Sequence, residues 1–309
     1  MATLEPTQPV PMIPTESRIV SAESMQVVGR FAPSPTGPLH LGSLVAAVAS
    51  WLSARRANGR WLVRMEDIDT PRVIPGSADE ILGALQRYGL EWDGEIVWQS
   101  RRIALYEDAL ARLREKHLVY DCACSRAELA RAASAPLGAE AVYPGFCRDG
   151  IAEGKAARAI RFRAPNEAIG FDDLLRGHIE ENVAEKTGDF VVRRADGLFA
   201  YQLAVVVDDA DQGVTQVVRG ADLLISTPRQ IALQRALGYP TPEYAHVPLV
   251  VNPDGSKLGK RDGALPLPAL DEVRVRETLA VALRHLGIEG MLEGSTREML
   301  ESALRSFAV

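Results

Sequence analysis

The sequence has few cysteines, no long apolar run and no excess of positive charge. Only 3 of its 309 residues are cysteine, so the chain cannot close a complete set of disulfides. No apolar run approaches the roughly 18 residues that a membrane span needs, and the start lacks the basic-then-apolar pattern of a secretion signal. We therefore predict a cytoplasmic protein with no membrane partner.

The net charge of −6 excludes a global positive field that would attract nucleic acid. A nucleic-acid partner would need a local basic face, although clusters of basic residues are more often simply solvated surface. The candidate clusters are Arg101 with Arg102, Arg112 with Arg114 and Lys116, and Arg158 with Arg161 and Arg163.

The first third of the chain predicts a β-α-β unit. Apolar residues indicate a buried strand over residues 25–32, a helix over 41–57 and a second strand over 60–65. Two further helices are expected, one opened by the capping box Ser77-Ala78-Asp79-Glu80 and one opened by Ser100.

The middle of the chain predicts an interruption of this sheet. Residues 118–122 are expected to return to the sheet, but residues 125–154 are rich in alanine, glycine and turn formers, and 159–189 alternate like an antiparallel excursion. The second half of the sheet is then expected to include residues 190–194 and 214–219. We therefore predict an α/β fold with an inserted domain.

The two ends of the chain differ in character. Residues 1–25 hold four prolines among polar residues, which predicts a disordered extension. Further helices are expected from Thr227, around 272–286 and around 296–307.

Residues 29–43, GRFAPSPTGPLHLGS, lie at the carboxyl end of the first strand, where α/β sheets bind ligands. The two commonest glycine-rich phosphate loops, GxxxxGK[ST] and GxGxxG, are absent. Instead, three prolines fix the backbone, while Gly37 and Gly42 leave room for a ligand beside the first turn of the next helix. The free N–H groups and dipole of that turn suit an anion.

His40 stands at this turn, and the distant segment SKLGKRDG supplies Lys257, Lys260 and Arg261. Taken alone, a single histidine is more often a structural residue than a catalytic one, and a KxxKR loop is more often solvated surface than a ligand-binding segment. Together, imidazole and ammonium groups would neutralise charge that grows on a phosphate during displacement at phosphorus. The pair PLHLGS and KLGKR resembles the two signature motifs of class I aminoacyl-tRNA synthetases, and RFAPSPTGPLHLG with RMEDIDTPR resembles their glutamyl branch, over residues 27–262.

The resemblance implies an ATP site with Mg²⁺ bound to the nucleotide. Two residues depart from the signatures: Ser43 replaces the second histidine of the first motif, as is usual in the glutamyl branch, and Gly259 replaces a phosphate-binding serine of the second. His40 and Lys260 are implied as the catalytic pair. The implied ATP-binding residues are Pro33, His40, Gly42, Ser43, Lys257, Lys260 and Arg261.

The resemblance also implies a glutamate pocket. Glu66 would pair with the α-ammonium group, and Arg219 would hold the side-chain carboxylate, because a guanidinium suits a carboxylate better than a carboxamide. Two alternatives stay open: Tyr201 as a core aromatic, and Glu66 with Asp67 and Asp69 as an acidic turn or a magnesium cluster. The implied glutamate-binding residues are Arg30, Phe31, Ala32, Pro33, Ser34, Glu66, Tyr201 and Arg219.

The cysteines lie in two short motifs, CAC at Cys122 and Cys124 and YPGFC at residues 143–147, which ends in Cys147. Three thiolates so spaced suit one structural Zn²⁺ ion, with the phenol of Tyr143 as an unusual fourth ligand. His117 or Asp121 could replace the phenol, and three unmetallated cysteines are the alternative.

Bacterial glutamyl-tRNA synthetases continue well beyond the second signature with helical domains that read the anticodon, whereas this chain ends soon after Arg261. A short synthetase with the CxC and YxxxC motifs resembles the glutamyl-queuosine tRNA(Asp) synthetase family. Its members activate glutamate without tRNA and transfer it to queuosine at the wobble position of tRNA(Asp). The implied partners are ATP, L-glutamate and the anticodon stem-loop of queuosine-containing tRNA(Asp), and we expect a monomer.

The implied fold is a Rossmann-like parallel sheet with an inserted zinc-binding α+β domain and a short helical C-terminal region. The first half of the catalytic domain would span residues 26–120, the acceptor-type insertion 121–188 and the second half 189–255. The lysine loop and C-terminal helices would span 256–309, after the extension at 1–25. Two alternative functions remain: a compact synthetase that charges the 3′ end of tRNA(Glu), and a non-catalytic tRNA-binding paralogue.

We expect the Lys260→Ala variant to form adenylate at least about tenfold more slowly, which corresponds to a loss of roughly 1.4 kcal/mol of transition-state stabilisation. The measurement is glutamate-dependent exchange of labelled pyrophosphate into ATP. An unchanged exchange rate would remove Lys260 from the catalytic residues.

Overall fold

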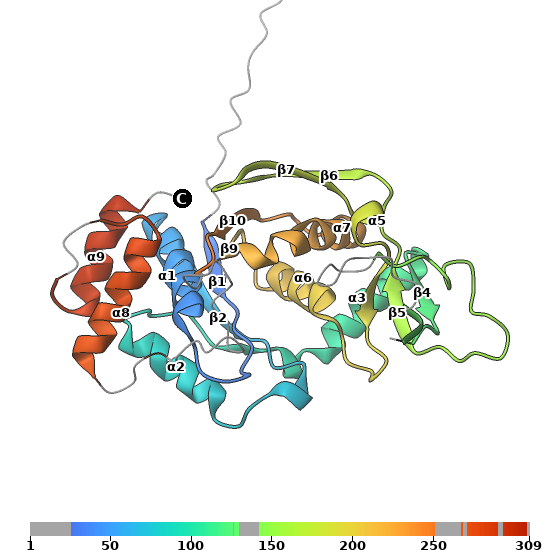
Figure 1. Cartoon of the computed structure of the whole chain (residues 1–309), viewed down its shortest axis with the longest axis horizontal. Coiled ribbons are helices and arrows are strands. Elements are labelled where there is room, and N and C mark those ends of the chain that lie inside the picture. Colours follow the sequence, from blue (N-terminus) through green and yellow to red (C-terminus); the bar gives the residue numbers. More distant parts are fainter. Residues whose placement is uncertain are drawn as a thin grey trace, which may run out of the picture.

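The computed structural model describes residues 26–125, 127–129, 142–250, 267, 271–289 and 293–307 (Figure 1). The extension predicted at residues 1–25 lies outside this part of the chain, and so does the lysine loop, with Lys257, Gly259, Lys260 and Arg261.

The N-terminal part forms the predicted β-α-β unit. Strand β1 (Val28–Phe31) pairs in parallel with β2 (Arg60–Met65), and helix α1 (Leu41–Arg56) connects them. The short strand β3 (Val97–Trp98) extends the sheet by pairing in parallel with the end of β2. Helix α1 is buried along most of its length, because strands cover one side and the C-terminal helices pack against it as well.

The second half of the fold repeats this arrangement around another parallel pair. Strand β9 (Gln216–Gly220) pairs with β10 (Glu243–Val247), connected by the 3₁₀ segment η3 (Ala221–Ser226) and helix α7 (Thr227–Leu237). The two halves meet where Thr215 N donates a hydrogen bond to Val28 O at 3.0 Å and Val28 N donates to Thr215 Oγ1 at 2.9 Å.

Helix α6 (Tyr201–Asp211) and strand β10 were not predicted. The segment LAVVVDD within α6 is buried throughout, so no polar face produces a helical period in the sequence. Its run of valines is typical of a strand, and packing on several sides overrides this preference.

Two strands that were expected to extend the parallel sheet lie elsewhere. Strand β4 (Val119–Cys122) and strand β8 (Phe190–Arg193) instead flank β5 (Ala159–Phe162) in a separate antiparallel sheet. The prediction was wrong because a short apolar run is compatible with either sheet.

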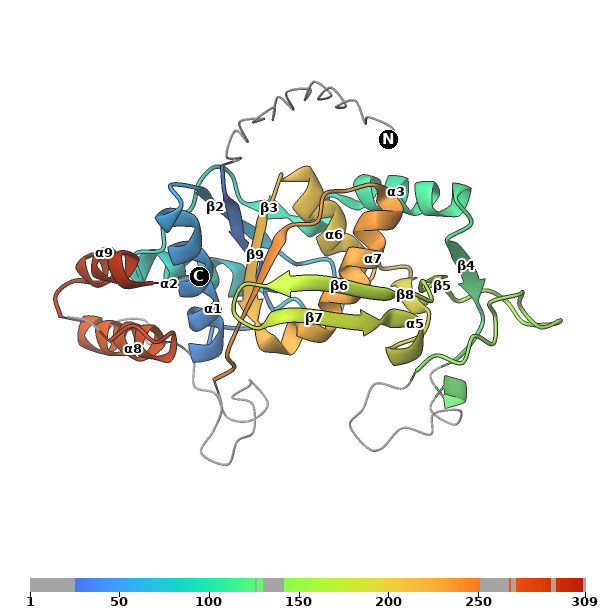
Figure 2. The ribbon, with the colours of Figure 1, turned by 90° about the horizontal axis from the view of Figure 1, so that it is seen from above.

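The antiparallel excursion contains a long hairpin of β6 (Ala168–Asp173) and β7 (Gly177–Asn182), followed by the short helix α5 (Val183–Lys186). Asp173, the last residue of β6, pairs in parallel with Tyr244 of β10. Figure 2 shows the hairpin reaching from the antiparallel sheet toward β9, so this excursion contacts the parallel sheet directly.

Two serines that were expected to cap helices instead form hydrogen bonds with other segments. Helix α2 (Ser77–Arg87) is capped by Gly76 without a side-chain hydrogen bond, and the Ser77 hydroxyl accepts a hydrogen bond from Gly37 N at 2.9 Å. Ser100 lies in the 3₁₀ turn η2 (Gln99–Arg101), ahead of helix α3 (Ile103–Glu115), and its N and Oγ donate to Asp67. Ser77 and Ser100 therefore tether loops of the predicted motifs.

The C-terminal helices are confirmed as α8 (Glu272–His285) and α9 (Thr296–Ser306), and both pack against α1 at the end of the molecule opposite β4 and β5 (Figure 1). The remaining short 3₁₀ turn is η1 (Thr70–Arg72). Among the described helices, none has the length and apolar character needed to cross a membrane.

Candidate active site and cysteine cluster

A cavity of about 340 Å³ opens where the carboxyl ends of β1, β9 and β10 meet. Every described residue that was predicted to bind ATP or glutamate lines it. These residues are Arg30, Phe31, Ala32, Pro33, Ser34, His40, Gly42, Ser43, Glu66, Tyr201 and Arg219. Their roles remain predictions, and so does the placement of the lysine loop relative to His40.

His40 caps helix α1 rather than lying free on its surface. Its Nδ1 accepts a hydrogen bond from Ser43 N at 3.3 Å, which fixes the ring at the first turn of the helix. A Cβ atom added at Gly42 would lie 3.1 Å from Cε1 of this ring, so a glycine gives the imidazole its space. Gly42 and Ser43 of this turn line the same cavity, and the first turn of a helix suits an anionic ligand.

Glu66 is buried at 8% exposure and lies next to two arginines. Arg64 Nη2 is 3.4 Å from its Oε1, but Arg64 Nη1 and Arg30 Nε both also approach Asp209, at 2.8 and 3.3 Å. Burial raises the pKa of Glu66 to about 7, although Arg64 and Arg30 oppose this shift. Both arginines are also paired with Asp209, so their positive charge does not neutralise Glu66 alone. The Glu66 carboxylate can therefore still attract a cationic group in the cavity.

Asp208 and Asp209, which end the segment VVVDD, were not identified as site residues. Asp208 is fully buried and accepts hydrogen bonds from Arg102 Nε, Gln99 Nε2 and Tyr106 Oη. Burial alone would raise the pKa of Asp209, but Arg30 and Arg64 lower it below its usual value. Two adjacent aspartates in an otherwise apolar segment are the sequence signal that points to this network.

The acidic residues of RMEDIDTPR do not form a shared metal site in the structure. Asp67 accepts hydrogen bonds from Ser100, and Asp69 pairs with Arg72 and Arg194, while Glu66 faces the cavity. These separate partners contradict the magnesium-cluster alternative.

Arg219 is buried at 4% exposure in the wall of the cavity. Its Nε donates to His246 Nε2 at 3.1 Å, and its Nη2 donates to Thr227 Oγ1 at 2.8 Å. Nη1 has no hydrogen-bond partner within the described part of the chain. A buried N–H group without a partner costs about 1–3 kcal/mol, so a carboxylate that accepted from Nη1 would be bound favourably.

Tyr201, the first residue of α6, fits both of its interpretations. It lines the cavity and it also packs against the apolar cluster formed by α3, α6 and α7. Packing against this cluster therefore holds the Tyr201 ring at the edge of the cavity.

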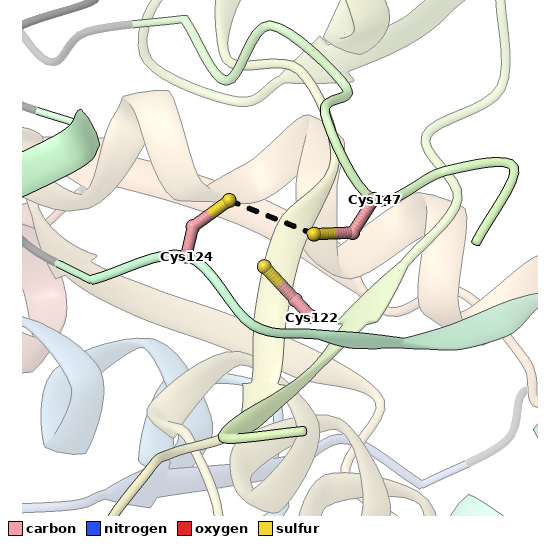
Figure 3. Close-up of side chains that lie close together, drawn as sticks. All are labelled: Cys122, Cys124 and Cys147. Atoms are coloured by element: carbon pink, nitrogen blue, oxygen red, sulfur yellow. Dashed lines mark hydrogen bonds between the residues drawn. The ribbon is translucent and has the colours of Figure 1, made fainter. Parts of the chain in front are cut away.

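The three cysteines meet as their spacing predicted, although they come from segments more than twenty residues apart (Figure 3). Their Sγ atoms all lie within 4.8 Å of one another, and those of Cys124 and Cys147 are 3.6 Å apart. The Tyr143 hydroxyl lies 3.5 Å from Cys122 Sγ and 3.6 Å from Cys124 Sγ. Zn–S bonds of about 2.3 Å in a tetrahedral site place sulfurs about 3.8 Å apart, so this donor set fits one metal ion.

His117 and Asp121 do not join the cluster: in the described part of the chain, the candidate metal-binding group contains the three cysteines without any histidine or acidic residue. Asp121 instead pairs with Arg114 at 3.0 Å on the exposed face of β4. Of the proposed fourth ligands, Tyr143 is the one that lies against the thiols.

A buried arginine compensates the charge of the cluster. Arg161 Nε donates to Cys122 Sγ at 3.4 Å, and its guanidinium lies 3.7 Å from the centre of the Tyr143 ring. Burial opposes ionisation, but hydrogen bonds from Tyr143 and Arg161 lower the pKa of the Cys122 thiol to about 7. Burial and the neighbouring sulfurs raise the pKa of Cys124 to about 11. Arg161 therefore favours negative charge on sulfur, as metal ligation requires.

Each predicted basic cluster contains an arginine that has a partner within the protein. Arg102 bonds Asp208, Arg112 bonds Leu237 O at the end of α7, and Arg161 is buried beside Cys122. The charges of these three arginines are therefore not fully available to a partner molecule.

Comparisons with known proteins agree with the geometry. The family model for the catalytic domain of class I tRNA synthetases (E and Q) matches residues 26–303. A glutamyl-Q tRNA(Asp) synthetase of Geobacter sulfurreducens is 59% identical over 274 residues, which cover 87% of each chain. Another from Thiobacillus denitrificans is 59% identical over 260 residues, 84% of this chain and 85% of its own. The chain belongs to the glutamyl-Q tRNA(Asp) synthetase family.

The solved structures place this family within the class I synthetase fold. The glutamate-tRNA synthetase of Elizabethkingia anophelis matches with a TM-score of 0.76 and 27% identity over 89% of this chain. The match spans 65% of that longer protein. The predicted class I fold with a parallel sheet is thereby confirmed.

The pKa of Glu66 generates a prediction about pH. In the free protein Glu66 is protonated below pH about 7 and ionised above it. Since only the carboxylate attracts an ammonium group, we expect the KM for glutamate to fall as the pH rises through about 7. Pyrophosphate exchange measured across this range tests the dependence.

The matched control is Glu66→Gln, which keeps the shape but cannot ionise. This variant should have a higher KM for glutamate that no longer changes across the same pH range. A wild-type KM that is flat through about pH 7, or a variant with the wild-type profile, would contradict the role of Glu66.

Proposed function

We propose that the protein activates L-glutamate with ATP in the absence of tRNA and then transfers it to the queuosine base at the wobble position of tRNA(Asp). The observation that carries the proposal is that the wall of one cavity contains both a carboxyl group, on Glu66, and a guanidinium group with an unpaired N–H, on Arg219. An amino acid with a second carboxylate matches these charges. The names of the relatives, which share more than half of their residues with this chain, support the tRNA substrate.

Activation is a displacement at phosphorus. An oxygen of the glutamate α-carboxylate forms a bond to the α-phosphorus of ATP, and the bond from this phosphorus to the oxygen of the leaving pyrophosphate breaks. His40, held by Ser43 N, and Lys260 would stabilise the negative charge of the transition state. Mg²⁺ bound to the nucleotide would offset the charge of the departing pyrophosphate. A hydroxyl of the queuosine cyclopentenediol then attacks the acyl carbon, and AMP leaves.

Arg219 supports glutamate as the substrate rather than glutamine. A carboxylate oxygen can accept from the unpaired Nη1, whereas a carboxamide presented through its NH₂ group would leave this donor unsatisfied. A carboxamide can also turn its oxygen toward Nη1, so the preference for glutamate comes from its negative charge beside the guanidinium.

We further propose that Cys122, Cys124, Cys147 and Tyr143 hold one structural Zn²⁺ ion. Strand β4 supplies the first cysteine, and the loop at residues 143–147 supplies the last two ligands. The ion would join these two segments. Within the described residues, their apolar side chains form a small cluster that includes Tyr120 and Ala123. We expect a monomeric, cytoplasmic enzyme.

The substrate is tested by incubating the protein with radiolabelled glutamate, ATP and purified tRNAs. We expect label on queuosine-containing tRNA(Asp) and none on the same tRNA that lacks queuosine. Label on tRNA(Glu) instead would establish the compact synthetase alternative. Glutamate-dependent pyrophosphate exchange in the absence of tRNA excludes the non-catalytic alternative, and its absence at all magnesium concentrations would support it.

The metal is tested by elemental analysis of protein purified without chelator. We expect one zinc per chain, which chelation removes with a fall in melting temperature, because metal binding energy contributes to folding. Cys147→Ser should lower the zinc content, whereas a cysteine-preserving control such as Asp121→Asn should not. A wild-type protein without metal would establish the unmetallated alternative.

A further inference from the structure

A buried histidine that the sequence analysis did not identify contacts Arg219 from the neighbouring strand. His246 is fully buried in β10, and the register of the parallel pair places it next to Arg219 of β9.

The direction of each hydrogen bond fixes the state of the histidine. Arg219 Nε can only donate, so His246 Nε2, at 3.1 Å, must accept and carries no proton. The ring proton is then on Nδ1, which donates to Asp173 Oδ2 at 2.6 Å. Burial and the charge of Arg219 lower the pKa of His246 to about 4, against the opposing effect of Asp173, so the ring is neutral at physiological pH.

Asp173 is itself fixed by the backbone. Its Oδ1 accepts hydrogen bonds from Leu175 N and Arg176 N, both at 3.0 Å, and from His246 N at 3.3 Å. These donors leave Oδ2 for the histidine. The turn of the β6–β7 hairpin therefore sets the orientation of a carboxylate that reaches the core of the parallel sheet.

The guanidinium of Arg219 is held at two of its three nitrogens as a result. Nε bonds His246 and Nη2 bonds Thr227 Oγ1, while the buried Nη1 has no partner among the described residues. We propose that Asp173 and His246 are positioning residues that orient Arg219 toward the side-chain carboxylate of the substrate, with Asp173 holding His246 in the Nδ1–H tautomer. This inference deepens the proposed function and rests on it.

The variant Asp173→Asn tests the tautomer with little change of shape. The three N–H donors at Oδ1 require the amide oxygen at that position, so the new NH₂ group faces His246 Nδ1. Two donors cannot share a hydrogen bond, so we expect the ring proton to move to Nε2, where Thr227 Oγ1 at 3.1 Å can accept it but where it opposes the Arg219 Nε–H. We expect the KM for glutamate to rise at least about tenfold and the KM for ATP to change less than about threefold.

The matched control is Asp172→Asn on the same strand. Asp172 is 86% exposed and also bonds a histidine, His178 Nδ1 at 2.7 Å, but this pair faces solvent. The control should keep the wild-type KM for both substrates. An equal rise of the glutamate KM in both variants would indicate a general effect on the hairpin and would overturn the proposal.

Nitrogen-15 NMR of the histidine rings reads the tautomer without any activity. We expect a protonated Nδ1 in the wild type and a protonated Nε2 in Asp173→Asn. A wild-type ring protonated on Nε2 would overturn the proposal, and so would a switched tautomer with an unchanged glutamate KM.

A second pair of variants applies if Asp173→Asn does not fold. His246→Gln can place an amide oxygen near the position of Nε2 and so keeps an acceptor for Arg219, whereas His246→Asn keeps only a donor near Asp173. We expect the glutamate KM of His246→Asn to exceed that of His246→Gln by about tenfold. Equal values would overturn the proposal. A wild-type protein without any glutamate-dependent exchange would instead contradict the proposed function, and the NMR result would still decide the tautomer.

Discussion

The two halves of the parallel fold are joined by a set of buried charges around Arg64. This residue of β2 is inaccessible to solvent, and it reaches Asp208 and Asp209 of α6 at 3.7 and 2.8 Å, although Asp209 lies 145 positions further along the chain. A buried charge is tolerated only with close partners, and the loss of one partner from such a set typically costs about 3–5 kcal/mol. Asp209 also balances Arg30, and Arg64 borders Glu66. Arg30 and Glu66, which line the cavity, are thus positioned by charges that do not line it.

The sequence predicted the elements whose signal is local. The strand, proline-rich loop and helix over residues 28–56 are contiguous, so their motif could place Arg30 and His40 at one site before any tertiary contact was known. The C-terminal helices carry amphipathic patterns and were located to within one or two residues. Most residues of helix α6 and strand β10 are buried, so no alternation of buried and exposed positions marks these elements in the sequence.

The less predictable part of the site depends on pairings that only the fold defines. His246 and Asp173 are isolated polar residues in the sequence, separated by more than seventy positions. The parallel register of β9 and β10 places His246 next to Arg219, and the pairing of β6 with β10 brings Asp173 to His246. Ser77 and Ser100 show the converse. Their sequence context indicates helix caps worth about 1 kcal/mol each, yet hydrogen bonds to Gly37 and Asp67 compete successfully for the same side chains.

The contact between β6 and β10 has a consequence for how such an enzyme can be rebuilt. Asp173 belongs to the antiparallel excursion but its backbone pairs with Tyr244, and its carboxylate bonds the fully buried ring of His246 in β10. The excursion is therefore not an interchangeable module that can be exchanged between synthetases at its two junctions. A chimera with the hairpin of another synthetase would also receive that hairpin's turn. The buried charges next to Arg219, in the wall of the cavity, would then differ as well.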